Sequence, residues 1–362
     1  MTDTSKPQIG SRVLINLACV VVVIAGLRAA ESVIVPLLLS VFLTMLGVPL
    51  LNGLMKVGLP KSFSVLAVVL AMLVVLVGVG ALVGGSVNRF TKAVPAYQQR
   101  MTQLQQTAEE RLKSLSEYFF DSTVAEDQVN PAQQILDQVN PARVLQFAGN
   151  LLSRLAGIVS DVFLVILTTI FMLSEAAGFG AKLRAAFGAT WPQHLALGNV
   201  MNQVHHYLII KSGISFVTGL VIGIWVWAWG VDFPILWGLL AFLFNYIPNI
   251  GSIMAAVPPI LLALIQPDGG VALAITVAIG YLVVNFVLGN ILEPRFLGQR
   301  LGLSTLVVFG SLVFWGWVWG AVGMLLSVPL TMVVKILLQN NEEFGWVAVL
   351  LEKAPEKAPA SE

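Results

Sequence analysis

The chain has 362 residues, of which 57% are hydrophobic and only 11% are charged, and its net charge is +1. Ordinary soluble domains have about 45–50% apolar and about 25% charged residues, so this composition excludes an ordinary soluble fold and predicts a membrane protein. The balanced charge gives no general attraction to nucleic acid. The chain has a single cysteine, Cys19, which lies in an apolar run. One cysteine cannot form an internal disulfide or a CxxC motif.

Three apolar runs open the chain, each close to the length of about 20 residues that a helix needs to cross the hydrocarbon layer. They cover residues 13–30, 33–51 and 63–87. Arg28 and Glu31 stand where a signal peptide would have the small residues of its cleavage site. We therefore predict that residues 1–87 form transmembrane helices 1–3, with the first run retained as a membrane helix.

The next stretch, 88–153, is polar and rich in Gln, and its apolar residues recur at helical spacing (Met101, Leu104, Ala108, Leu112, Leu115). This pattern predicts a small helical domain outside the membrane.

Two Asn-Pro-Ala triplets, at 130–132 and 140–142, are similar to the aquaporin motif. In aquaporins that motif caps half-helices in an apolar core, whereas here both triplets lie in polar sequence. Asn as N-cap followed by Pro at the first helical position is a common helix start, so we interpret both triplets as helix caps.

A fourth apolar run, 155–173, precedes a polar stretch that carries all three histidines. We predict transmembrane helix 4 and a cytoplasmic loop over 154–206. A fifth run, 207–229, ends in Trp225, Trp227 and Trp229, and tryptophan favours the membrane interface.

Beyond residue 229 the apolar pattern is broken in two places. The pieces 235–247 and 253–265 are separated by a Pro-Asn-Ile-Gly sequence, and the pieces 305–314 and 322–338 by Trp-Gly-Trp-Val-Trp-Gly. Between them, 271–292 is long enough to span. The last segment, 339–362, has several charged residues and an Ala/Pro-rich end, and is predicted to be a charged cytoplasmic tail.

Basic residues prefer the cytoplasmic side, and this rule places both termini inside, together with the loop that contains Lys56 and Lys61. The polar helical domain 88–153 is then extracytoplasmic.

If the first broken segment, 235–265, were one kinked span, Arg295 and Arg300 would lie outside. If it is a re-entrant hairpin that enters and leaves on the outside, both arginines lie inside, so the charge rule favours the hairpin. The second broken segment, 305–338, as a hairpin entering from the inside, keeps Lys335 and the tail lysines inside.

The predicted fold is thus an all-α polytopic membrane protein with about six full transmembrane helices and two re-entrant helical hairpins in an inverted repeat. The transport core is 207–338, with two units that each contain a helix and a hairpin. Irregular backbone survives at membrane depth only where protein or a water-filled cavity satisfies it, and paired broken segments indicate a transport site.

The polar residues at and after the first break are the candidate site. Candidates for substrate binding are Asn245, Pro248, Asn249, Gly251, Ser252 and Asn285, and candidates for a gate or for ion coupling are Asn290, Glu293 and Arg295. The alternatives are a structural kink for the tip, an interhelical hydrogen bond for Asn285 and a local salt bridge for Glu293 and Arg295.

Motifs for enzymatic chemistry are missing from the sequence. There is no HExxH zinc motif and no GxxxxGK[ST] phosphate loop, and the adjacent His205 and His206 would point about 100° apart on a helix. We expect neither catalysis nor a metal or other cofactor, and we expect transport to be driven by an ion gradient or by the gradient of the solute.

The sequences FNYIPNIGSIMAAVPPILLAL, NFVLGNILEPRFLGQRLGLSTLVV and WGWVWGAVGMLLSVPLTMV closely resemble the autoinducer-2 exporter family of permeases, and PLLLSVFLTMLGVPLLNGLMKVGLPKSFSVL resembles it near the N-terminus. The resemblance covers nearly the whole chain. It implies an inner-membrane permease that assembles as a homo-oligomer, a pentamer, and moves a substrate-carrying half against a fixed scaffold. It also implies export of autoinducer-2 or, for some members, Na⁺/H⁺ antiport. The family commonly has an aromatic or other residue after the Ile-Pro dipeptide, where this chain has Asn249.

The leading hypothesis is a permease that moves a small polar solute by alternating access in the lipid bilayer, with Na⁺ or H⁺ as a coupling partner. The alternatives are a cation/H⁺ antiporter on the same fold and a channel-like or structural oligomeric membrane protein.

Overall fold

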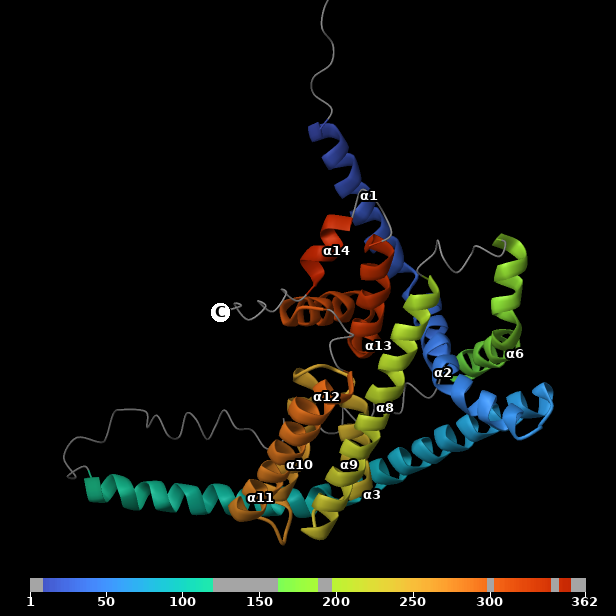
Figure 1. The fold of residues 1–362 in the computed structure, drawn as a ribbon. Coiled ribbons are helices and arrows are strands. Elements are labelled where there is room, and N and C mark those ends of the chain that lie inside the picture. The colour runs from blue at the N-terminus through green and yellow to red at the C-terminus, as the bar shows by residue number, and fades with distance from the viewer. Residues whose placement is uncertain (1–8, 120–161, 188–196, 298–302, 340–344, 353–362) are drawn as a thin grey trace, which may run out of the picture. The chain divides into compact units, whose positions relative to one another are not determined.

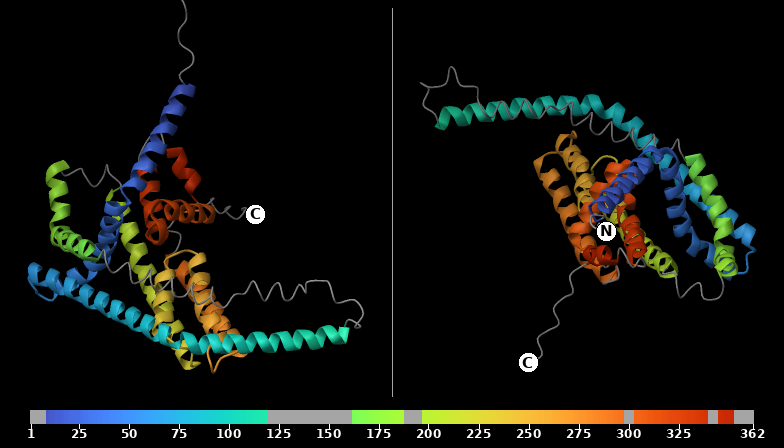
Figure 2. Two further views of the ribbon diagram at one scale, coloured as in Figure 1. Left: turned by 180° about the vertical axis from the view of Figure 1, so that it is seen from behind. Right: turned by 90° about the horizontal axis from the view of Figure 1, so that it is seen from above.

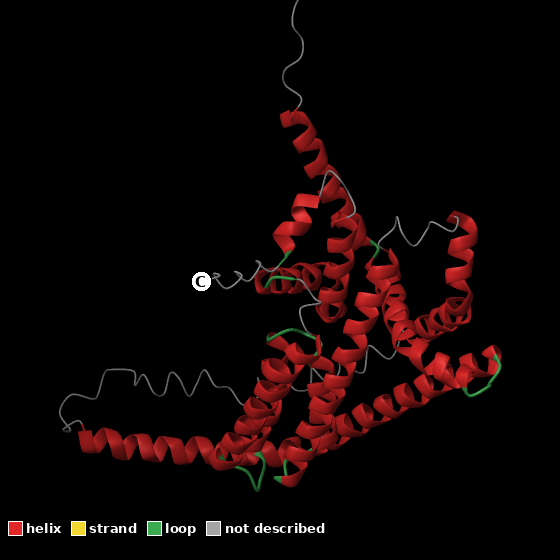
Figure 3. Ribbon diagram, viewed as in Figure 1, coloured by secondary structure: helices red, strands yellow, loops and turns green. Residues whose placement is uncertain are grey.

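The computed structural model describes residues 9–119, 162–187, 197–297, 303–339 and 345–352 (Figure 1). All regular elements in these ranges are helices (Figure 3). Five of them are long and apolar enough to cross a membrane: Glu31–Lys56, Lys61–Arg100, Gln203–Ala228, Val271–Leu297 and Thr305–Gln339. The prediction of an all-α polytopic membrane protein is therefore confirmed.

The number of spans stays a prediction, as does the re-entrant arrangement. The predicted first and fourth spans are represented by shorter apolar helices, Ala18–Ala29 and Phe163–Glu175. Both Asn-Pro-Ala triplets lie outside the described residues.

The chain separates into two compact units. The first unit comprises Met1–Ala71, Asp161–Ile210 and Leu297–Glu362, and the second comprises Met72–Ser160 and Lys211–Phe296. Helix α3 (Lys61–Phe119) is one continuous helix in the views of Figure 2. It passes without a break through residue 87, where the sequence predicted the start of a polar domain.

The first unit contains α1 (Ile9–Ala29), α2 (Glu31–Lys56), α6 (Val162–Phe187), α13 (Thr305–Gln339) and α14 (Gly345–Leu351). Helix α2 packs along α6, and the buried Ser40 hydroxyl lies 2.9 Å from the carbonyl oxygen of Val165. Such interhelical hydrogen bonds hold helices together in lipid, where apolar surfaces give little driving force.

Helix α13 is a helical hairpin. Its backbone leaves helical geometry at Trp319 (φ −132°, ψ 26°) and Gly320 (φ 57°, ψ −139°). The Trp315 indole N–H donates to the Thr331 hydroxyl at 3.0 Å, although a straight helix would separate these residues by about 24 Å. Gly323 packs so closely on the Trp315 carbonyl that a Cβ would collide with it.

Helix α8 (Leu197–Ala228) is divided between the units, and the second unit contains it from Lys211 onward. The second unit also contains α9 (Pro234–Phe244), α10 (Ile250–Ile265), α11 (Val271–Val284), the π-helix η2 (Asn285–Leu292) and most of α12 (Glu293–Leu297). Helices α9 and α10 pack on each other and form a second hairpin, with its tip at residues 245–249. Asn249 takes a left-handed φ of 58°, and Gly251 lies against the Phe244 carbonyl, where a Cβ would collide. The first sequence break is therefore a turn between two short helices.

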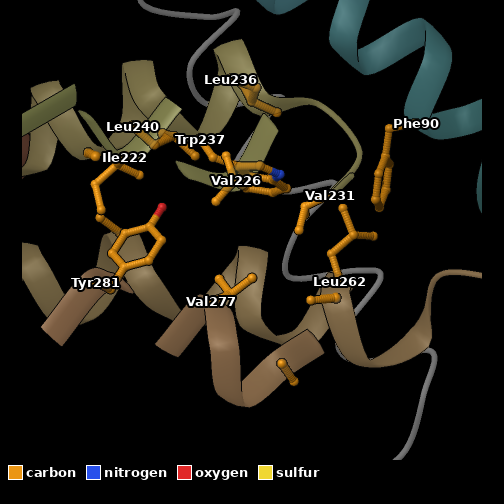
Figure 4. Close-up of a cluster of buried hydrophobic side chains, with 14 of the residues drawn as sticks. Phe90, Ile222, Val226, Val231, Leu236, Trp237, Leu240, Leu262, Val277 and Tyr281 are labelled. Carbon is orange, nitrogen blue, oxygen red and sulfur yellow. The ribbon is translucent and has the colours of Figure 1, made fainter. Parts of the chain in front are cut away.

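The core of the second unit is made by apolar side chains from α3, α8, α9, α10 and α11 (Figure 4). Its members include Phe90, Ile222, Val226, Leu236, Trp237, Leu240, Leu262, Val277 and Tyr281. Helices α8 and α9 approach through glycines: a Cβ on Gly238 would lie 2.6 Å from the Gly219 carbonyl oxygen and 3.1 Å from Gly223 Cα. Small residues allow such close approach in membrane helices.

We expect Gly238→Ala to separate α8 from α9 and to lower the free energy of unfolding by about 1–3 kcal/mol, as overpacking does in other cores. The measurement is the thermal unfolding of the detergent-solubilised protein, followed by tryptophan fluorescence. Gly213→Ala is the matched control, because no atom lies within 4 Å of its added Cβ. Equal unfolding temperatures for the two variants would show that the glycine contact is not needed.

Candidate functional site

One turn of α8 carries the polar groups around which the candidate site is built. Lys211, Ser212 and Ser215 lie within this turn, inside the apolar stretch Gln203–Ala228. Lys211 is 4% exposed and Ser215 is fully buried. Ionisable residues inside membrane helices are rare and usually functional, so this turn requires partners from neighbouring elements.

Lys211 forms a buried ion pair with Glu293. Its Nζ lies 2.6 Å from Glu293 Oε1, and the two side chains are 5% and 18% exposed. Because removing charges from water is costly, such a pair persists only when the attraction between the charges offsets the desolvation. Glu293 directly follows the eight-residue π-helix η2, and π-helical turns are frequent at functional sites.

The tip of the α9–α10 hairpin is held on the same turn by two side-chain hydrogen bonds. Asn245 Nδ2 donates to Ser215 Oγ at 2.9 Å, and the Tyr246 hydroxyl donates to Ser212 Oγ at 2.7 Å. Asn245 and Tyr246 are 8% and 4% exposed. A single helical turn therefore binds both the hairpin tip and the carboxylate that follows the π-helix.

The other predicted tip residues are less enclosed. Pro248 and Ser252 are half-buried, Asn249 is exposed, and Gly251 is buried. The Asn249 side chain makes no capping hydrogen bond to the start of α10. The structure thus places Asn245 in the polar cluster, while Asn249 lies at its exposed edge.

The candidate gate residues separate in the same way. Asn285 is half-buried at the start of the π-helix, and Asn290 and Arg295 are exposed. Within the described ranges, Glu293 pairs with Lys211 and not with Arg295. The alternative of a local salt bridge between Glu293 and Arg295 is therefore wrong. The buried Lys211 cation of α8 requires a negative partner, whereas the exposed Arg295 is solvated by water.

The tip of α13 has a different chemistry. The rings of Trp315 and Trp319 stack with their centroids 4.9 Å apart. The Trp319 indole N–H donates to the carbonyl oxygen of Leu27 at 3.1 Å. Leu27 lies in the last turn of α1, where carbonyl groups lack partners within the helix. Arg28 lies 4.6 Å above the Trp317 ring. This tip is filled by aromatic packing, which favours the α9–α10 tip as the site of polar contact.

A second polar network lies beyond the far end of α8, about 25 Å along the helix from Lys211. The Tyr97 hydroxyl donates to Asp232 Oδ2 at 2.7 Å, and the Trp237 indole donates to the Asp232 carbonyl at 2.6 Å. Gln266 accepts from the Asp232 backbone N–H at 3.3 Å and donates to the Gly230 carbonyl at 3.1 Å. The second unit therefore has polar contacts near both ends and apolar packing between them.

Sequence reasoning missed Lys211, Ser212, Ser215 and Tyr246. A signal for two of them was present, because Lys211, Ser215 and Thr218 follow one another at i, i+4 and i+7 on one face of an apolar helix. Among the described residues, no group of three or more His, Cys, Asp and Glu side chains is placed to hold a metal ion.

Comparison with known proteins gives consistent matches over nearly the whole chain. The family model of AI-2E family transporters matches residues 17–343. The AI-2 transport protein TqsA of Escherichia coli is 38% identical over 350 residues, which are 96% of this chain and 98% of TqsA. The protein YhhT of E. coli is 37% identical over 352 residues (96% and 97%), and a protein of Haemophilus influenzae is 38% identical over 346 residues (94% and 96%).

We expect Glu293→Gln to lower the free energy of unfolding by about 3 kcal/mol, because it leaves Lys211 as an uncompensated buried charge. The double variant Lys211→Met/Glu293→Gln removes that charge and should recover most of the loss. Chemical unfolding in detergent measures both.

The control is Glu175→Gln, which breaks the exposed ion pair between Glu175 and Lys182. The side chains of Glu175 and Lys182 are 53% and 69% exposed. Exposed pairs contribute about 0–1 kcal/mol, so this variant should unfold like the wild type. Additive effects of the two substitutions at the buried pair would contradict the interaction.

Proposed function

The chain belongs to the AI-2E family of transporters, and on that premise we propose that this multi-pass membrane protein is a permease of the bacterial inner membrane. It moves a small polar solute of the autoinducer-2 type by alternating access. The observation that carries the proposal is the polar turn of α8, which holds a broken hairpin tip and a buried ion pair inside an otherwise apolar unit.

The groups on this turn suit a solute that exchanges hydrogen bonds. The Ser212, Ser215 and Tyr246 hydroxyls and the Asn245 amide can each donate and accept. In the described state Asn245 is paired with Ser215, and Tyr246 with Ser212. A solute with hydroxyl or carbonyl groups can replace these contacts one for one, so the tip can release α8 without leaving buried groups unpaired. Autoinducer-2 is the first solute to test, because the relative TqsA is named as an AI-2 transport protein.

The ion pair favours a second candidate, a cation/H⁺ antiporter. Protonation of Glu293 would remove the negative partner of Lys211 and so couple a proton to the local structure. The same pair serves a solute permease that is driven by H⁺ or Na⁺. Homo-oligomeric assembly, a pentamer by resemblance, and cytoplasmic termini belong to both versions of the proposal.

The deciding experiment uses purified protein in liposomes, with autoinducer-2, Na⁺ and H⁺ gradients tested separately. We expect autoinducer-2 to move, and Asn245→Ala to reduce its rate roughly tenfold, since the loss of one hydrogen bond to a buried partner costs about 1–3 kcal/mol. Asn52→Ala is the matched control, because Asn52 is exposed and lies outside the candidate site.

Each outcome of the liposome assay has a direct meaning. Movement of cations without autoinducer-2 would replace the permease with the antiporter. Movement of neither would contradict both functions.

Alternating access is tested separately with cysteines at the tip. Replacing Cys19, the single cysteine, by Ser gives a background in which Asn249→Cys and Ser252→Cys report accessibility. We expect membrane-impermeant thiol reagents to label both positions from each side of the membrane under different gradients. Labelling from one side under every condition would favour the channel-like or structural alternative.

A further inference from the structure

The buried face of α8 changes character halfway along the second unit. Its residues at i, i+4, i+7, i+11 and i+15 are Lys211, Ser215, Thr218, Ile222 and Val226, and all are at most 4% exposed. The first three are polar and the last two are apolar. The polar side chains therefore form a track that begins at the ion pair and ends at Thr218.

One further polar group lies beyond the end of this track. The Tyr281 side chain comes from α11, is 2% exposed, and directs its hydroxyl toward the side of the core where Ile222 and Leu240 lie (Figure 4). Among the residues that the structure describes, the hydroxyl has no hydrogen-bond partner. Tyr281, Ile222 and Leu240 belong to one buried apolar cluster, and Ile222 and Leu240 are completely buried, so the hydroxyl lies in an apolar shell.

An unpaired hydroxyl is an unfavourable way to fill an apolar core. Phenylalanine would pack the same ring without desolvating a polar group. The two other buried tyrosines described above are paired, Tyr246 with Ser212 and Tyr97 with Asp232. Tyr281 therefore carries a buried hydroxyl that makes no hydrogen bond to the described residues in this state.

We propose that the Tyr281 hydroxyl is a contact for the transported solute, and that the solute path continues from Thr218 along α8 to Tyr281 in another state of the second unit. The inference rests on the proposed function and narrows its substrate class. A single hydroxyl in an apolar shell can hydrogen-bond an uncharged group, but it cannot replace the hydration shell of a bare cation. The contact therefore fits an uncharged part of a solute that bears hydroxyl or carbonyl groups.

The first test compares Tyr281→Phe with Tyr246→Phe in the full-length protein reconstituted in liposomes. We expect Tyr281→Phe to unfold at the same or a higher temperature than the wild type while its autoinducer-2 transport falls roughly three- to tenfold, the effect of one hydrogen bond on a rate. Tyr246→Phe loses an existing hydrogen bond and should unfold at a lower temperature. Wild-type transport by a stable Tyr281→Phe protein would overturn the inference.

The second test needs no transport and separates this inference from the proposed function. In the Cys19→Ser background, Ile222→Cys reports on the side of the core toward which the Tyr281 hydroxyl points (Figure 4). Leu262→Cys is a matched control in the same core, because Leu262 is 4% exposed in the wild type. We expect a water-soluble methanethiosulfonate to modify Ile222→Cys roughly tenfold faster, because thiolates react only where water reaches them.

Equal inertness of the two cysteines would overturn the path even if autoinducer-2 is transported. Selective modification of Ile222→Cys would keep the path even if the wild type moves no autoinducer-2, and only the proposed substrate would then fail.

Discussion

The buried cation at Lys211 is the constraint on which the polar architecture of the second unit depends. A lysine that is 5% exposed within an apolar helix requires a negative partner, and Glu293 supplies it from the residue that follows the π-helix. This pairing fixes the end of the π-helix beside α8. The neighbouring Ser212 and Ser215 then receive the hairpin tip, so two irregular segments, which would be costly in lipid, are satisfied by one regular helical turn.

The two hairpins solve the same backbone problem with different side chains. Each turns at a residue with positive φ, Asn249 or Gly320, and each has a glycine soon afterwards whose missing side chain lets one arm pass a carbonyl of the other. In α13 the turn is filled by stacked tryptophans. In the α9–α10 hairpin, Asn245 and Tyr246 join the turn to α8 through side-chain hydrogen bonds to Ser215 and Ser212, which are contacts that a polar solute can replace.

The helical class and both breaks could be predicted because they depend on local sequence: apolar runs of spanning length, interrupted by Pro, Asn and Gly. The partner of Glu293 could not, since a pair separated by 82 positions forms only through tertiary structure, and the nearby Arg295 was the obvious local candidate. The π-helix has no compositional signature. The continuity of α3 through residue 87 was missed because a change from apolar to polar sequence does not end a helix whose backbone bonds are internal.

The contacts at the polar turn differ in strength, and this difference would order the events of the proposed transport cycle. Side-chain hydrogen bonds between membrane helices contribute about 0.6 kcal/mol on average, so the bonds from Asn245 and Tyr246 can be exchanged at room temperature. Leaving one member of a buried ion pair without its partner costs about 3–5 kcal/mol. In the proposed cycle the tip would therefore release α8 while Lys211 and Glu293 stay paired, unless a proton or another ion compensates one of the charges. A solute would thus act on the tip and a coupling ion on the pair, through adjacent positions of one helix.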